Sequence, residues 1–201
     1  MLFRSRRAVP ELMVDVITSL DGFASADGWP GLWGMGGPEY FAWLEEDAGA
    51  HSYTALMGAT TYRLFAGFVD SGEEDMTGLT ALDKVVFSST LDEPLAWANT
   101  RLVRGDAVEE VSAMKQDGDT SLRTIGSLGL CRSLLGAGLV DRFRVVVFPV
   151  VNGATGREHF YTGWPDVVLE SVDHRTLDGR LQMMEYVPRI VDGPADATAG
   201  S

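Results

Sequence analysis

Residues 122–151 read LRTIGSLGLCRSLLGAGLVDRFRVVVFPVV, and this stretch decides the fold class. A short apolar strand at 122–127 runs into a turn, an apolar helix is predicted over 128–140, and a long β-branched strand over 141–151. A strand, a helix and a second strand in this order are typical of a parallel sheet covered by helices. Cys131 follows the apolar pattern of the helix and is predicted to be a buried structural thiol.

The same alternation extends to both sides of this stretch. Further strands are predicted over 12–19, 53–58, 83–89 and 100–105, and further helices over 38–48, 59–68 and 106–118. An Asp-Gly pair between two alternating runs in 167–188 predicts a closing hairpin. The expected fold is α/β, with a mostly parallel central sheet, helices on both faces and a C-terminal antiparallel hairpin. We expect one domain over 1–190 and a disordered tail over 191–201, which is small and polar.

Composition excludes several classes of function. A net charge of −13 argues against a nucleic-acid partner, which needs a basic face. No apolar run approaches the ~20 residues of a membrane helix, and the start lacks a signal-type segment, so we expect a cytoplasmic protein without a membrane partner. The single cysteine excludes an internal disulfide and a cysteine-cluster metal site. None of His51, His159 and His174 has a helical metal spacing, so no metal site is predicted.

Small polar residues follow four of the predicted strands. Glycine, serine and threonine cluster at 19–22, 58–62, 88–90 and 126–129. Turns and helix caps use the same residues, so each cluster alone is a weak signal. Ligands of open α/β sheets gather at the carboxyl ends of strands, and backbone N–H groups at helix starts suit phosphates. The joint placement therefore predicts a dinucleotide or another phosphate-bearing ligand.

The order of these motifs resembles the dihydrofolate reductase-like superfamily. It is most similar to the branch related to the reductase domain of bacterial riboflavin biosynthesis, the RibD C-terminal domain. The resemblance spans about 12 to 188 and is carried by SLDGFAS, LMGATTYRLF, KVVFSSTL, IGSLGLCRSLLGAGLVDRFRVVVFPVVNGATG and the closing hairpin.

The resemblance implies a three-layer dihydrofolate reductase-like fold with NADPH bound across the strand ends. Gly58, Thr60 and Thr61 match the phosphate-binding helix start, and Ser88, Ser89 and Thr90 match the segment near the adenosine ribose. Arg104 matches a position beside the adenine end. The turn that approaches the pyrophosphate and nicotinamide corresponds to Gly126, Ser127, Leu128 and Gly129, and the loop beside the nicotinamide and substrate to Asp21 and Gly22. The strand in GLVDRFRVVVFPVV is one that this branch commonly uses in a homodimer.

Two residues depart from the family pattern. Ala59 stands where family members usually carry a basic residue that pairs with the 2′-phosphate. Either Arg104 or Arg63 compensates, or the preference for NADPH over NADH is weak and NADH is possible. Tyr40 stands where true dihydrofolate reductases carry a catalytic carboxylate, which argues against a folate substrate and makes Tyr40 a candidate catalytic residue.

The resulting hypothesis is an NADPH-dependent reductase that transfers hydride to a C=N or C=O bond of a small, pterin- or pyrimidine-like heterocycle. Asp21 is the predicted proton donor or the carboxylate that positions a donating water, and its alternative role is that of a turn residue. Trp29, Trp33 and Trp43 are candidate substrate contacts, with core or lid packing as the alternative, and 28–37 is predicted to form a flap. The acidic run 45–47 is expected to be a solvated face. The alternative function is a nicotinamide- or flavin-nucleotide-binding protein without turnover.

Overall fold

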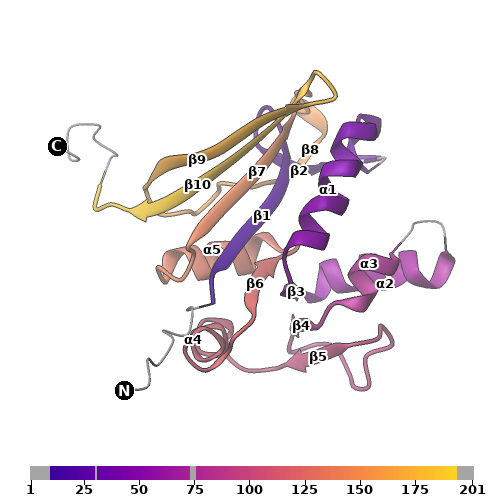
Figure 1. Ribbon diagram of the computed structural model, residues 1–201, viewed down its shortest axis with the longest axis vertical. Coiled ribbons are helices and arrows are strands. Elements are labelled where there is room, and N and C mark those ends of the chain that lie inside the picture. Colours follow the sequence, from indigo (N-terminus) through magenta and orange to yellow (C-terminus); the bar gives the residue numbers. More distant parts are fainter. Residues whose placement is uncertain (1–9, 30, 73–75, 194–201) are drawn as a thin grey trace, which may run out of the picture.

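An eight-stranded sheet forms the centre of the protein, in the order β5-β4-β3-β6-β1-β7-β10-β9 (Figure 1). The structure is a computed structural model that describes residues 10–29, 31–72 and 76–193. Parallel pairing joins the first six of these strands, and β10 runs antiparallel to both of its neighbours. The strands are β1 (Leu12–Ser19), β3 (Tyr53–Gly58), β4 (Lys84–Phe87), β5 (Thr100–Val103), β6 (Ser121–Thr124), β7 (Arg142–Phe148), β9 (Val167–Leu177) and β10 (Leu181–Ile190).

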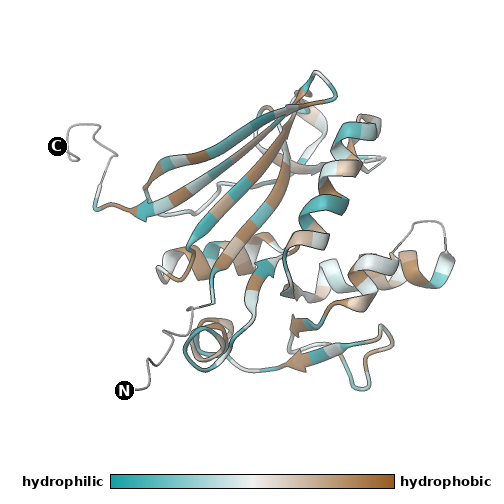
Figure 2. Cartoon of the chain, viewed as in Figure 1, coloured by the Kyte–Doolittle hydropathy of each residue, from teal (hydrophilic) through white to brown (hydrophobic). Residues whose placement is uncertain are grey.

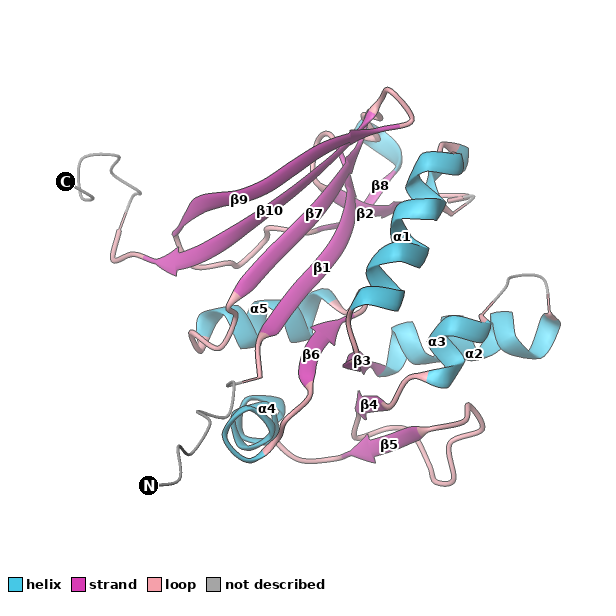
Figure 3. Ribbon diagram, in the orientation of Figure 1, coloured by secondary structure: helices cyan, strands magenta, loops and turns pink. Residues whose placement is uncertain are grey.

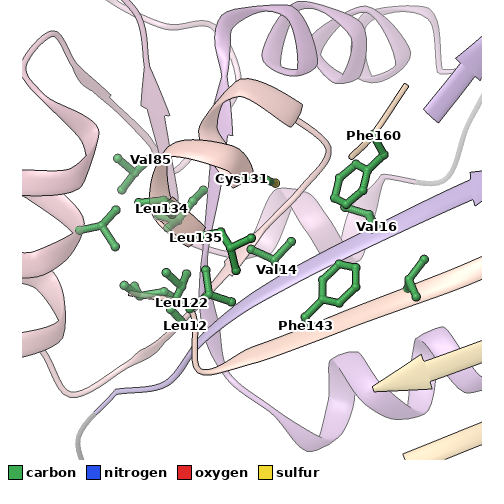
Figure 4. Close-up of a cluster of buried hydrophobic side chains, with 14 of the residues drawn as sticks. Leu12, Val14, Val16, Val85, Leu122, Cys131, Leu134, Leu135, Phe143 and Phe160 are labelled. Atoms are coloured by element: carbon green, nitrogen blue, oxygen red, sulfur yellow. The ribbon is translucent and has the colours of Figure 1, made fainter. Parts of the chain in front are cut away.

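Helices cover both faces of the sheet, which confirms the predicted layers (Figure 3). One face packs against α4 (Ala107–Asp117) and α5 (Leu128–Gly136), and its core includes Cys131, buried as predicted beside Leu134 and Val14 (Figure 4). The other face packs against α1 (Pro38–Ala50) and α2 (Ala59–Ser71) through two further apolar clusters. Because side chains alternate along each strand, β1 sends Leu12, Val14 and Val16 into the first core and faces α1 with the residues between them.

The closing hairpin also holds the first helix in place. The β9–β10 turn at Asp178 and Gly179 has positive φ at both residues, 50° and 64°, as an Asp-Gly hairpin turn requires. The Asp178 carboxylate accepts hydrogen bonds from the backbone N–H groups of Gly37, Glu39 and Tyr40, at 3.0–3.2 Å. Helix α1 is therefore capped by a residue from the far end of the chain. Both strands of the hairpin carry a mixture of hydrophobic and hydrophilic residues (Figure 2).

Several short elements were not predicted. Two four-residue strands, β2 (Phe23–Ala26) and β8 (Gly156–His159), form a separate antiparallel pair. A short helix, α3 (Thr77–Ala81), precedes β4, and single 3₁₀ turns occur at Leu32–Gly34 and Gly153–Thr155. The expected strand over 141–151 ends at Phe148, and the expected helix over 128–140 ends at Gly136. The predicted tail falls mostly on 194–201, outside the described residues.

Strand β7, the strand that the family resemblance links to a homodimer, has no free edge. Strand β7 pairs with β1 on one side and β10 on the other, so both of its edges are used within the sheet. A second copy of the chain could reach it only through a sheet face, whereas the outer edge of β9 is the end of the sheet. In the described part of the chain, no helix has the length and apolar character needed to span a bilayer.

Candidate functional site

The carboxyl ends of β3 and β6 meet at one joint built around Ser127. The Ser127 hydroxyl accepts a hydrogen bond from the backbone N–H of Gly58 at 2.8 Å and lies 2.9 Å from the Thr61 hydroxyl. Gly58 ends β3 and precedes α2, and Ser127 lies between β6 and α5. The structure thus brings together two segments that are 69 residues apart, as the cofactor hypothesis expects.

Two helix N-termini open at this joint without side-chain caps. Gly58 and Ser127 are the N-cap residues of α2 and α5, and neither residue caps its own helix with a side-chain hydrogen bond. The turn before α5 is left-handed, with φ of 53° at Gly126 and 63° at Ser127. A Cβ on Gly126 would lie 3.0 Å from the Thr61 Oγ1, so the close approach requires glycine. Free N–H groups at two adjacent helix starts suit the two charges of a pyrophosphate.

The third predicted segment forms a separate polar cluster after β4. The Ser88 hydroxyl accepts hydrogen bonds from the N–H groups of Thr90 and Leu91, at 3.0 and 3.2 Å. Arg63 of α2 donates to the Thr90 hydroxyl at 3.3 Å, and Arg104, which follows β5, donates to the Leu91 carbonyl at 2.7 Å. Both arginines that could compensate for Ala59 therefore hold the same loop. The remaining predicted cofactor residues lie at the strand ends as well: Thr60, Ser89, Leu128 and Gly129.

Asp21 is held in a turn at the end of β1. Its carboxylate accepts hydrogen bonds from the Ser19 hydroxyl at 2.6 Å and from the backbone N–H groups of Asn152 and Gly153 at 3.1 and 2.9 Å. The Gly22 N–H closes the turn onto the Ser19 carbonyl, and Gly22 has a φ of 82°. The hydrogen bond from Ser19, then those from Gly153 and Asn152, lower the pKa of Asp21 to about 2. An ionised carboxylate favours a positioning role over direct proton donation.

We expect the Asp21 carboxyl carbon to titrate near pH 2 in a carbon-detected NMR experiment, below the ordinary value of 3.8. Replacing Ser19 with alanine removes the largest of the stabilising hydrogen bonds and should raise the midpoint. A midpoint at the ordinary value in the wild-type protein would show that the three donors do not hold this carboxylate.

Tyr40, the predicted catalytic residue on α1, lies in the apolar cluster that packs α1 against the sheet. Tyr40 is 3% exposed, and its ring packs against Trp43 and Phe148. Burial raises the pKa of the Tyr40 phenol, so its hydroxyl stays neutral. Trp43 is buried too and lies under the Arg144 guanidinium, 4.7 Å from ring centroid to Cζ. These contacts give both rings a packing role, and a catalytic role for Tyr40 stays a prediction.

The described part of the predicted flap, 28–29 and 31–37, packs against the apolar cluster that contains Tyr40. The Trp33 ring lies 5.3 Å from that of Phe148 and 5.9 Å from that of Trp29, centroid to centroid. The Trp33 indole N–H donates to the Asn152 side-chain oxygen at 3.1 Å. Leu32 and Trp33 both have positive φ, 46° and 47°, which is unusual for bulky residues. Packing thus accounts for this pair of tryptophans in the present arrangement, and direct substrate contacts stay a prediction.

Asp47 was expected in a solvated acidic face, and this expectation is wrong. Its carboxylate accepts hydrogen bonds from Arg144 at 2.9 and 3.0 Å and from Arg123 at 2.5 Å. Arg144 also makes a bidentate pair with Asp15, its direct neighbour across the β1–β7 ladder. Burial raises the pKa of Asp47, but the two arginines outweigh it and lower that pKa to about 2.

Two hollows border this part of the sheet. The larger, of about 550 Å³, lies at the amino ends of the strands and is lined by the Arg123–Arg144 network. The smaller, of about 250 Å³, lies at the carboxyl end of β1, next to the Asp21 turn. Ligands of parallel sheets gather at carboxyl ends, so the smaller hollow belongs to the candidate site. Two of its lining residues, His159 and Tyr161, were not among the predicted site residues.

The model of the RibD C-terminal domain family matches residues 10–183. The chain belongs to this family. A curated relative, the uncharacterised protein YyaP of Bacillus subtilis, is 24% identical over 186 residues, which cover 87% of this chain and 93% of the relative. The family and the observed sheet together confirm the predicted dihydrofolate reductase-like fold and its RibD branch.

Solved structures of the same fold span most of the chain. A protein from Shewanella sp. PV-4, provisionally described as a riboflavin biosynthesis protein, has a TM-score of 0.68 at 20% identity and covers 89% of this chain and 99% of its own. Dihydrofolate reductase from Enterococcus faecalis, complexed with NADP(H) and RAB-propyl, has a TM-score of 0.57 at 16% identity; the match covers 89% of this chain and 96% of that one. These likenesses show the fold. A nicotinamide dinucleotide stays the predicted cofactor.

The residues at the strand ends fit such a cofactor. The starts of α2 and α5 offer N–H donors for a pyrophosphate. Gly126 lies close to Thr61, and the absence of a side chain on Gly126 leaves space there. The arginine pair Arg63 and Arg104 stands at the far end of the same edge. No group of three or more histidine, cysteine or acidic residues within the described ranges could hold a metal ion.

Proposed function

We propose that the protein is an NADPH-dependent reductase that transfers hydride to a C=N or C=O bond of a small, flat heterocycle. The observation that supports it most is the joint at Ser127, which presents two free helix N-termini to one point at the strand ends. Membership of the RibD C-terminal domain family supports the reaction class. The substrate is a pterin- or pyrimidine-like molecule.

When bound, the nicotinamide supplies the hydride. The chain's own residues bind and orient it: the N–H groups at the starts of α2 and α5 hold the pyrophosphate, and Ser88 and Thr90 border the ribose end. The ionised Asp21 would fix the loop beside the nicotinamide and would position a water as the proton source for the substrate. Leu32, Trp33, Met35 and helix α1 pack in one apolar cluster and would exclude bulk water on the other side.

NADPH is preferred over NADH in this proposal, because Arg63 and Arg104 take the place of the basic residue missing at Ala59. Replacing both with methionine should weaken NADPH by about tenfold or more relative to NADH, since a hydrogen bond to a charged group contributes roughly 1.5–3 kcal/mol. Dissociation constants from tryptophan fluorescence measure both. Arg101→Met is the matched control, because this exposed arginine pairs with Glu110 instead. Equal losses for the two cofactors would place the 2′-phosphate away from these two arginines. Ala59→Arg tests the family position itself and should raise the affinity for NADPH relative to NADH if the phosphate lies there.

The alternative is a nicotinamide- or flavin-nucleotide-binding protein without turnover. One observation favours it: the helix position that carries an acid in true dihydrofolate reductases holds Tyr40, buried and neutral. A yellow chromophore that co-purifies with the protein would support the flavin form.

Titration with NADPH and NADH, followed by a turnover assay with pterins, flavins and pyrimidine precursors, separates these functions. The proposal expects binding and oxidation of NADPH with at least one of these substrates. Binding without oxidation across the panel would favour the alternative, and binding of neither cofactor would contradict both nicotinamide functions.

We further propose that the reductase acts as a cytoplasmic homodimer. Since β7 is interior, the surface that favours a second copy is the hairpin, where Leu169, Val172, Val187 and Ile190 are exposed along β9 and β10. Light scattering after gel filtration measures the oligomeric state.

A further inference from the structure

The larger hollow lies at the edge of the sheet opposite to the candidate site, where helix α1 ends at Ala50. Its volume is about 550 Å³, and its walls come from the end of α1, from the amino ends of β1, β3, β6 and β7, and from the closing hairpin. The proposed reduction takes place at the carboxyl ends of the strands, so it leaves this hollow without a role.

A row of charged residues crosses the sheet beside the hollow. Across β1, β7, β10 and β9, the direct neighbours are Asp15, Arg144, Glu185 and Asp173. Arg144 is satisfied by carboxylates, and Asp173 accepts a hydrogen bond from Arg175 at 3.2 Å. Glu185 stands directly opposite Asp173, a pairing of like charges that is unfavourable in a sheet. Glu185 is therefore the member of the row that lacks a partner of its own.

Glu185 and Arg142 line the hollow and face each other without a hydrogen bond. Among the described residues, neither the Glu185 carboxylate nor the Arg142 guanidinium makes one, and their closest atoms, Oε1 and Nη1, are 3.7 Å apart. Their side chains are only 19% and 27% exposed, and polar groups buried to this extent normally have hydrogen-bond partners. A gap above 3.5 Å between two such groups leaves room for a third group that pairs with both.

These two side chains define what a ligand must carry. The Arg142 guanidinium has only donors and suits a planar carboxylate, whereas the Glu185 carboxylate has only acceptors and suits an ammonium. Because the two groups are 3.7 Å apart, the opposite charges of the ligand must lie close together, as they do on an α-carbon. A purely anionic ligand would meet Glu185 and Glu11, which lies 3.8 Å from Arg142, and a purely cationic ligand would meet Arg142 itself.

The rest of the lining suits a neutral side chain. Met13, Ala50 and the ring of Tyr53 add apolar surface to the hollow. The Arg123 guanidinium covers the Tyr53 ring, 4.1 Å from Cζ to the ring centroid, and donates to Asp47, so its charge is already balanced. At ~30 Å³ per water molecule, the volume is ample for a small organic molecule.

We infer that this hollow binds a free α-amino acid with a neutral side chain, its carboxylate on Arg142 and its ammonium on Glu185. Such a site stands apart from the cofactor edge and requires neither NADPH nor a reductase reaction. An amino acid bound there would supply both missing partners and would stabilise the folded protein, because the site exists only in the folded state.

Binding measurements on the whole protein test this site. Arg142→Met removes the guanidinium, and Glu185→Gln removes the negative charge at nearly constant shape. Arg189→Met and Glu170→Gln are the matched controls, since both residues are exposed on the same hairpin and do not line the hollow. The probes are L-leucine, L-phenylalanine and L-glutamine. Each is compared with its analogues that lack the ammonium or the carboxylate, which for L-phenylalanine are 3-phenylpropanoate and 2-phenylethylamine.

At least one of the three amino acids is expected to bind the wild type in calorimetry and to raise its unfolding temperature. Arg142→Met and Glu185→Gln should each weaken that binding by about ten- to hundredfold, the effect of one lost hydrogen bond between charged groups. Both analogues of that amino acid should bind the wild type more weakly by a similar factor, and the control variants should keep the wild-type affinity.

Thermal unfolding shows whether each variant is folded, and the analogues test the same two charges on the wild-type protein. No binding of any of the three amino acids at millimolar concentration would overturn the inference. So would an analogue that binds as tightly as its parent, wild-type affinity in a folded Arg142→Met or Glu185→Gln protein, or an equal loss in the control variants.

Discussion

Replacing Arg144 with methionine is expected to lower the free energy of unfolding by about 3–5 kcal/mol, because it leaves two carboxylates facing a buried site without their main partner. Arg144 is 2% exposed and donates four hydrogen bonds, two to Asp15 and two to Asp47. Burial lowers the pKa of Arg144, but Asp15 and Asp47 stabilise its charged form, so that this pKa is raised overall. Denaturant unfolding monitored by tryptophan fluorescence measures the loss.

The control for this variant is Arg101→Met. Arg101 is an exposed arginine whose carboxylate partner is Glu110, and an exposed pair contributes about 0–1 kcal/mol. The pH dependence gives a second readout. The folded-state pKa of Asp47 is about 2, below its ordinary 3.8, so its contribution to stability is present above about pH 4 and is lost as the pH falls toward 2. A loss under 1 kcal/mol for Arg144→Met would show that the network is not structural.

Replacing Gly126 with alanine is expected to weaken NADPH by about 2–3 kcal/mol, a factor of roughly 30–150. The added methyl group would lie 3.0 Å from the Thr61 Oγ1, in a residue whose φ of 53° already disfavours a side chain. The turn must shift, and Ser127, which links the Gly58 N–H to Thr61, moves with it. Because the helix starts are aligned by these contacts, the cradle for the pyrophosphate loses its shape.

Gly67→Ala controls for the glycine change itself. Gly67 lies in α2 with open space at its Cβ, so this variant should bind NADPH as the wild type does and gain about 0.4–1 kcal/mol of stability. Fluorescence titration and thermal unfolding of both variants measure the two effects. Wild-type affinity in a folded Gly126→Ala protein would show that this turn does not shape the cofactor site.

The sequence predicts the framework well because its signals are local. The β-branched runs, the glycine and serine turns after them and the Asp-Gly hairpin each determine structure within a few residues, and the parallel sheet follows from their alternation. Strands β4, β5 and β6 end just before Ser88, Arg104 and Gly126. The first residues after these strands are therefore residues of the candidate site. Their meeting point could be expected because parallel strands present their carboxyl ends on one edge.

Long-range polar contacts could not be predicted in this way. Asp47 lies in an acidic run that reads as a solvated helix face, and its partners Arg123 and Arg144 are 76 and 97 residues away. The capping of α1 by Asp178 joins residues 138–141 apart. Periodicity carries no information about such pairs, and only the tertiary fold brings them together.

The hollow beside β1 was missed for a related reason. Strands β2 and β8 have four residues each and lie among glycines, too short for an alternating pattern to show. Unless the pairing of β2 with β8 is known, the sequence does not place His159 beside the residues after β1, and an isolated histidine is a weak signal of function. The available clue was Gly22, a glycine directly after Asp21, since such a position marks a close approach by another segment.

The most direct test of the central claim is the crystal structure of the protein with NADPH. The account predicts the pyrophosphate between the starts of α2 and α5, within hydrogen-bond distance of the N–H groups near Gly58 and Gly126, and the 2′-phosphate beside Arg63 and Arg104. A dinucleotide bound away from these strand ends, or crystals that take up no NADPH at saturating concentration, would contradict it.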